Sequence, residues 1–405
     1  MKKKINLGLV PRIIIAIVVG ILLGQLTFIP SSFIRVLITL ADLFSSFLNF
    51  VIPLMIIALI TKGIADLTEG AGKLLGVTFL SAYASTLVAG AIAYLVATTI
   101  FPLFITPDLV ENVAASGEGL TPYFTIPLDP ILSVTSALIF AFMIGLGISR
   151  LRENQAGEVM YAFFIEFEAI IMQVLSAIIV PLLPFYILSN FANMSYSGSV
   201  FVILSIFWRV FLMVIALQLL YIMLLFVLSG WYAGKNPFTL IKNQVAGYLT
   251  ALGTQSSAAT IPVNVEVAKK NGVSETIRNF VVPLGATIHL AGSMIAIIST
   301  AIAVLLMYNL PTDFASLGGF IAVLGIAMVA APGAPGGAIM SALPFLPMVG
   351  IISDTMQQLM ISLYITQDSF GTATNVSGDN AIAIFIDKLY QDRNNKKDTN
   401  KINHS

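Results

Sequence analysis

Long apolar runs alternate with short polar connections through the first half of the chain. Each run has at least the roughly 17 residues that a helix needs to cross a bilayer. The pattern therefore predicts six transmembrane helices, of which the longer ones are tilted. The runs cover 13–29, 33–61, 75–101, 131–149, 161–192 and 200–230.

Polar and flexible residues interrupt three of the four apolar runs of the second half. Each break is explained either by a Pro/Gly kink or by a binding site, because irregular backbone at membrane depth is tolerated only inside protein or beside a cavity. Two clustered breaks favour a binding site at their tips. The runs are 236–267, broken at 253–262; 280–310, broken near 289–293; 317–349, broken at 331–337; and 356–387.

Lys and Arg residues set the expected orientation. They precede the first run, flank the connection between the second and third, and follow the fourth and sixth, whereas the loops after the third and fifth contain none. By the positive-inside rule the N-terminus is cytoplasmic, and so is the basic tail after the last run. Both termini lie on one side only if 236–267 and 317–349 are re-entrant hairpins.

The predicted fold is an all-α integral protein of the plasma membrane, with eight transmembrane helices and two re-entrant helical hairpins in inverted repeats. The composition agrees, since 58% of residues are hydrophobic and only 10% are charged, against about 25% charged in soluble domains. The net charge of zero offers no footprint for nucleic acid. The absence of cysteine excludes disulfides and thiolate chemistry.

One stripe of the last apolar run is polar. Asp368, Thr372, Asn375 and Asp379 follow at offsets of 4, 7 and 11 residues, which return to the same face of an α-helix. Carboxylates inside a membrane are costly and mark functional sites by default. The stripe therefore predicts a site that binds cations or cationic groups, unless Asp379 is solvated near the cytoplasmic end.

The chemistry of the breaks complements this stripe. Helix N-termini at a hairpin tip, with the hydroxyls of Ser256 and Ser257, suit a substrate carboxylate. Carbonyl, carboxylate and amide oxygens, the last two from Asp379 and Asn375, suit a hard cation such as Na⁺. Asp368 is then available for a substrate ammonium group. His289 is either a packed, hydrogen-bonded residue or a proton relay in the helix break.

Four motifs resemble the glutamate-transporter family, the dicarboxylate/amino acid:cation symporters. The resemblance covers nearly the whole chain and is strongest from about 240 to 387. The substrate-binding motifs look most like those of the serine/threonine branch. The motifs are SSAATIPV at 256–263, PLGATI at 283–288, GAPGGAIM at 333–340 and NVSGD at 375–379.

The resemblance implies a homotrimer that works by an elevator mechanism, with the second hairpin as gate. A fixed scaffold would comprise residues 1–74 and 131–197. A transport domain would comprise 75–130 and 198–390, and it would move across the membrane with the substrate. Residues 391–405 would form a polar cytoplasmic tail.

The resemblance also implies roles for single residues. Ser257 and Asn375 would hold the substrate carboxylate, and Asp368 its amino group, with Thr372 nearby. Two sodium sites are implied, one at Asp379 with the backbone around His289 and Asn375, and one at Thr287 with the second-hairpin tip. The implied substrate set also contains Ser256, Gly333, Ala334, Pro335 and Gly371, and the implied ion set Gly285.

Two departures from the family pattern bear on ion and substrate. Ala291 stands where a third sodium site has its acid, although Tyr83 and Thr86 resemble other parts of that site, and His289 in place of Asn makes proton coupling an alternative. Gly371 and Gln255 stand where carriers of acidic substrates have arginine. A side-chain carboxylate would stay unpaired there, which favours a small neutral amino acid over acidic amino acids or C4-dicarboxylates.

Two other functions, an intramembrane protease and an ion channel, fit the sequence less well. An aspartyl intramembrane protease needs facing acids, but Asp368 and Asp379 lie about 16 Å apart along one helix at ~1.5 Å per residue. A serine protease would pair Ser256 or Ser257 with His289, without a supporting motif. An ion channel repeats its filter by oligomer symmetry, whereas here one asymmetric site per chain favours a carrier. The sequence therefore predicts a transporter and not an enzyme.

Overall fold

The described part of the chain is helical. The computed structural model describes residues 9–66, 72–106, 119–132, 134–153, 156–198, 200–329, 331 and 336–402, and these ranges contain no strand. Five helical segments among them are long and apolar enough to cross a membrane, which fits a membrane-embedded protein. These segments are Ser31–Ala58, Leu74–Leu103, Glu158–Tyr196, Ile203–Ala233 and Glu275–Met307.

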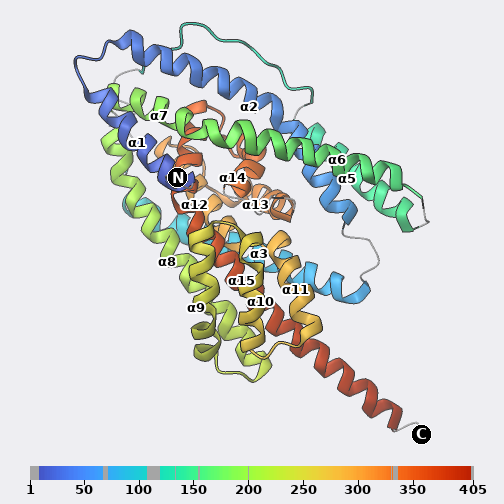
Figure 1. Ribbon diagram of the computed structural model, residues 1–405. Helices are drawn as coiled ribbons and strands as arrows, with labels where there is room; N and C mark the ends of the chain where they lie inside the picture. The colour runs from blue at the N-terminus through green and yellow to red at the C-terminus, as the bar shows by residue number, and fades with distance from the viewer. Residues whose placement is uncertain are drawn as a thin grey trace, which may run out of the picture.

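A first group of helices packs mainly within itself, at the top of Figure 1. In it α1 runs along α7, and α2 contacts α5, α6 and α7. A π-helical turn, η2 (Leu175–Ile179), joins α6 to α7, so the predicted run 161–192 is helical throughout. The group consists of α1 (Leu9–Gln25), α2 (Ser31–Asp66), α5 (Val134–Glu153), α6 (Glu158–Val174) and α7 (Val180–Tyr196).

A second group surrounds the last helix, α15, which extends beyond the rest of the molecule toward the C-terminus (Figure 1). Helix α15 contacts every other member of this group, and α12 packs between α3 and α15 with almost all of its residues buried. The members are α3 (Gly72–Ile100), α8 (Val200–Ala233), α9 (Pro237–Thr254), α10 (Ser257–Lys270), α11 (Glu275–Ile288), α12 (Ala291–Met307) and α15 (Asp354–Ile402).

The three predicted interruptions coincide with helix ends. Helices α9 and α10 form a hairpin whose tip is Gln255 and Ser256, and α11 ends and α12 begins on either side of His289 and Leu290. Helix α13 (Phe314–Val329) precedes the third break, and α14 (Gly337–Ala342) with the 3₁₀-helix η3 (Leu343–Val349) follows it. The first two breaks are thus confirmed, whereas most of the third, residues 332–335, lies outside the described residues. The eight membrane crossings and the re-entrant geometry stay predictions.

Buried amides hold the first hairpin against α15. Asn380 donates through Nδ2 to Gln244 Oε1 at 2.6 Å and to Asn264 Oδ1 at 2.7 Å. Asn264 in turn donates to the Val376 carbonyl at 2.9 Å. Because unsatisfied polar groups are costly in an apolar interior, this network fixes the register of the hairpin on the helix. The hairpin tip is thereby placed beside the polar stripe of α15.

Two glycines let α1 approach α7 closely. A Cβ at Gly20 would lie 2.5 Å from the Leu188 carbonyl oxygen, and a Cβ at Gly24 would lie 2.4 Å from that of Ala192. Glycines four residues apart on one helix face allow such backbone contact between membrane helices. The two glycines therefore allow the close contact between α1 and α7.

We expect Gly24→Ala to lower the free energy of unfolding by about 1–3 kcal/mol, because the added methyl group must displace backbone. Unfolding of the detergent-purified protein measures the change. The matched control is Gly76→Ala in α3, where a Cβ meets nothing within 4 Å. Equal stability of the two variants would contradict the proposed close packing of α1 on α7.

Candidate functional site

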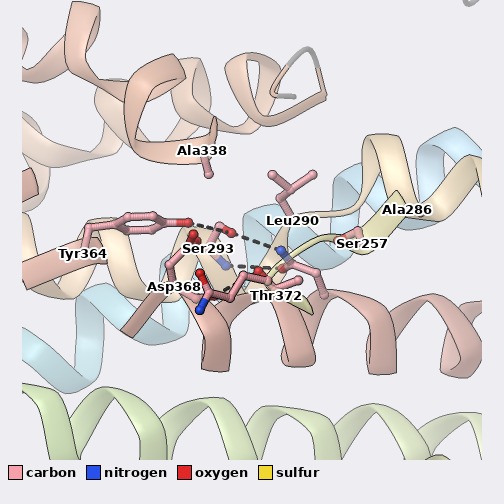
Figure 2. A pocket seen from close by; sticks show the side chains of 10 residues that line it. Ser257, Ala286, Leu290, Ser293, Ala338, Tyr364, Asp368 and Thr372 are labelled. Carbon is pink, nitrogen blue, oxygen red and sulfur yellow. Dashed lines mark hydrogen bonds between the residues drawn. The ribbon is translucent and has the colours of Figure 1, made fainter. Parts of the chain in front are cut away.

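A cavity lies where the first hairpin, the α11–α12 break, α14 and α15 meet. The empty space between the side chains there amounts to about 280 Å³, part of which is open to solvent. Figure 2 shows Ala338 of α14 on one side and Asp368 and Thr372 of α15 opposite. The lining residues are Gln255, Ser257, Ala286, Leu290, Ser293, Ala338, Tyr364, Asp368, Thr372 and Asn375.

Asp368 is the only ionisable carboxylate among these lining residues, and no lysine, arginine or histidine accompanies it. Its Oδ2 accepts a hydrogen bond of 2.7 Å from the backbone N–H of Gly336, which lies directly before α14. The residue is 4% exposed. A buried carboxylate with one neutral donor retains most of its demand for a cationic partner. The cavity is therefore suited to an ammonium group.

Asn375 joins α15 to the start of α12. Its Oδ1 accepts from the backbone N–H groups of Gly292 at 2.8 Å and Ser293 at 3.3 Å. Its Nδ2 donates to Ser293 Oγ at 3.0 Å. Helix N-termini leave backbone donors without intrahelical partners, and here a side chain of another helix satisfies two of them. The second N–H of the carboxamide remains for a ligand such as a carboxylate.

Asp379 is paired with His289. Their Oδ1 and Nδ1 atoms lie 3.0 Å apart, and neither side chain is exposed. The other ring nitrogen, Nε2, lies 2.9 Å from Ser85 Oγ, and Tyr221 donates its hydroxyl to the Ser85 carbonyl at 2.7 Å. Among the described residues no donor reaches Asp379 Oδ2. The alternative of a solvated Asp379 is wrong, because this residue is buried in the protein.

The free oxygen of Asp379 has the chemistry of a ligand for a hard cation. No group of three or more His, Cys, Asp or Glu residues occurs within the described ranges. A cation at Asp379 would therefore have to draw its other ligands from backbone carbonyl or amide oxygens, which Na⁺ accepts. Gly285, another expected ion ligand, lies beside this carboxylate, since a Cβ there would lie 2.8 Å from Asp379 Oδ1; its carbonyl oxygen accepts from the backbone N–H of His289 at 2.9 Å.

The other predicted residues lie in different surroundings. Ser257 and Thr372 line the cavity, and the Thr372 hydroxyl donates to the Asp368 carbonyl at 2.9 Å. Ser256 instead caps α10 by accepting from Ala259 N at 3.3 Å. Thr287 is exposed and donates to the Leu284 carbonyl at 2.7 Å.

Gly371 is buried but does not line the cavity; a Cβ there would lie in ordinary contact, 3.6 Å, with Gln218 Nε2. Gly333, Ala334 and Pro335 lie outside the described residues. At the expected third ion site, Ala291 is fully buried and the Thr86 hydroxyl donates to the Ala82 carbonyl at 2.9 Å.

Several lining residues did not follow from the motifs. Tyr364 donates its hydroxyl to Ser293 Oγ at 3.0 Å, and both side chains border the cavity (Figure 2). Tyr364 stands four residues before Asp368, on the same face of α15, so the polar stripe could have been extended to it. Ala286 and Ala338 lie within two of the motifs, but like Leu290 they carry no polar signal that would single them out as lining residues.

Known proteins match the chain over most of its length. The model of the sodium:dicarboxylate symporter family matches residues 9–389. The serine/threonine transporter SstT of Streptococcus thermophilus is 26% identical over 392 residues, which cover 92% of this chain and 94% of that protein. The protein of the same name from Acinetobacter baumannii is 26% identical over 398 residues, which cover 94% and 97%.

We expect His289→Leu to destabilise the protein by about 3–5 kcal/mol in Na⁺-free buffer, because it leaves the Asp379 carboxylate buried without a partner. Unfolding of the purified protein in detergent measures the loss. The double variant His289→Leu/Asp379→Asn regains part of it, since no buried charge remains. If the single and double variants lost the same stability, the loss would come from packing alone and not from the unpaired charge of Asp379.

Proposed function

Because the chain belongs to the sodium:dicarboxylate symporter family, we propose that this transporter carries a small neutral amino acid into the cell together with Na⁺. The observation that carries the proposal is the cavity beside α15, in which one buried carboxylate, Asp368, has no basic neighbour among the lining residues. Membership of this family makes the protein a transporter and not an enzyme.

The charges of the cavity favour a zwitterionic substrate without a charged side chain. Asp368 takes the ammonium group, while the second N–H of Asn375 and the N-terminal turn of α10, which begins at Ser257, offer donors to the carboxylate. A second substrate carboxylate would be desolvated without a cationic partner, which costs several kcal/mol. Acidic amino acids and C4-dicarboxylates, which carry such a second carboxylate, are the less favoured alternative. The names of the similar serine/threonine transporters also support a small neutral substrate.

The coupling ion follows from Asp379. An Asp379 oxygen that no described donor reaches is suited to a hard cation, and Gly285 of α11 lies beside the same carboxylate. Na⁺ is therefore the proposed co-substrate, with Asp379 as its charged ligand. A proton is the alternative, because His289 contacts the same carboxylate.

We also propose an elevator mechanism in a homotrimer with both termini in the cytoplasm, and the separation of the helices into two groups supports the elevator part. Helices α1, α2, α5, α6 and α7 contact one another more than they contact the group around α15. They correspond to the proposed scaffold, residues 1–74 and 131–197. The group around α15, together with α13, α14 and η3, corresponds to the proposed transport domain, which would carry the cavity across the membrane.

Uptake into proteoliposomes tests the substrate and the ion together. We expect serine, threonine and alanine to accumulate under an inward Na⁺ gradient and not under a choline gradient of equal strength. Replacing the Na⁺ gradient by a proton gradient tests whether the proton, the alternative coupling ion, drives uptake. If aspartate or a dicarboxylate displaced labelled serine far better than alanine does, the neutral-substrate proposal would be wrong.

Two substitutions separate the roles of the acids. Asp368→Asn should weaken amino-acid binding about 30-fold or more, because truncating one partner of a buried charge pair costs about 2–5 kcal/mol. Asp379→Asn should instead raise the Na⁺ concentration at half-maximal uptake, with a smaller change in amino-acid KM at saturating Na⁺. The control is Asp313→Asn, at an exposed acid before α13, which should transport normally. Equal effects of the first two variants on both ligands would contradict these assignments.

A further inference from the structure

Two hydroxyl groups meet at one end of the cavity. Tyr364 of α15 is fully buried, and its phenol donates to Ser293 Oγ at 3.0 Å. Figure 2 shows the tyrosine ring beside the cavity with its hydroxyl directed at Ser293. The same oxygen of Ser293 accepts from Asn375 Nδ2, also at 3.0 Å. Tyr364 and Ser293 are called the hydroxyl pair below.

The hydrogen bonds within the hydroxyl pair leave one donor proton and one acceptor lone pair unused. A serine oxygen has two lone pairs and one proton. Tyr364 and Asn375 occupy both lone pairs of Ser293, so its own proton is used by neither bond. The Tyr364 hydroxyl gives its single proton to Ser293, and its oxygen keeps a lone pair that can accept a hydrogen bond. The pair can therefore both donate to a third group and accept from it.

We propose that Tyr364 and Ser293 recognise a hydroxyl group on the side chain of the transported amino acid, and so make the carrier selective for β-hydroxy amino acids over alanine. This inference rests on the proposed transport of a small neutral amino acid. A hydroxyl is both donor and acceptor, as the hydroxyl pair requires. A methyl group offers neither, and a carboxylate accepts only and would add a negative charge beside Asp368.

The position of the pair agrees with this role. Tyr364 precedes Asp368 by one helical turn, so the group that binds the substrate ammonium and the group that reads the side chain stand on one face of α15. A serine ammonium and hydroxyl are separated by only three bonds, and one turn separates the two protein groups. The Tyr364 ring is fully buried, so it cannot withdraw to admit a bulky side chain without displacing its neighbours.

A substrate pair that differs by one hydroxyl tests the inference. Uptake of serine and alanine is measured in proteoliposomes for the wild type, Tyr364→Phe, Ser293→Ala and the double variant. We expect the serine-to-alanine ratio of Vmax/KM to fall about 2- to 10-fold in each single variant, the size of one neutral hydrogen bond. In the double variant this ratio should fall by less than the product of the two single-variant falls, because both substitutions disrupt one shared set of hydrogen bonds.

The matched control is Tyr186→Phe, which removes the hydroxyl of an equally buried tyrosine in α7, away from the cavity lining. It should leave the serine-to-alanine ratio unchanged, whatever it does to the rate. An unchanged ratio in both Tyr364→Phe and Ser293→Ala, with folding verified by size-exclusion chromatography, would overturn the inference. So would a wild type that transports alanine but not serine, although the proposed function would survive. A wild type that transports neither overturns both.

Discussion

The structure around α15 is organised by the cost of burying two carboxylates in an apolar interior. Asp368 is 4% exposed and Asp379 is 1% exposed, on a helix that the rest of its group surrounds. Within the described ranges neither acid has an arginine or lysine partner: Asp368 accepts a hydrogen bond from a backbone N–H at the start of α14, and Asp379 is paired with His289. Each acid thus requires an element with exposed backbone or a polar side chain at that depth. The helix breaks supply both.

The breaks depend on α15 in return. Ending α11 and starting α12 two residues later leaves the first N–H groups of α12 without partners in the protein interior. Asn375 accepts from two of them and donates to Ser293. The polar stripe of one helix and the interruption of the other therefore satisfy each other. Removing either alone would leave buried polar groups unpaired, so the two features are expected to be retained together.

The periodic features of this arrangement could be predicted from the sequence, because they are local. The offsets from Asp368 to Asp379 define one helix face, and the polar breaks at 253–262 and 289–293 mark helix ends. The partners could not be predicted in the same way. Ser85 lies 204 residues from His289 in the chain, and only packing of α3 on α12 brings them together. Thr287 belongs to a motif but faces outward, because one residue of shift on a helix turns a side chain by about 100°.

The spacing of the two acids also limits how the proposed substrate and ion can influence each other. About 16 Å separates Asp368 from Asp379 along the helix at ~1.5 Å per residue. At an effective dielectric constant of about 20, unit charges at that distance interact by only about 1 kcal/mol. Once each acid has bound its cation, the direct interaction is smaller still.

If the bound substrate and ion influence each other by more than about 1 kcal/mol, that influence must pass through residues that contact both sites. The turn from His289 to Ser293 contacts Asp379 at one end and Asn375 and Tyr364 at the other. A cation that draws this turn toward Asp379 would also move the groups that bind the substrate. The α11–α12 break thus contacts both the Asp379 carboxylate, through His289, and Tyr364, through Ser293. A rigid, unbroken helix at this place would remove that connection between the two sites.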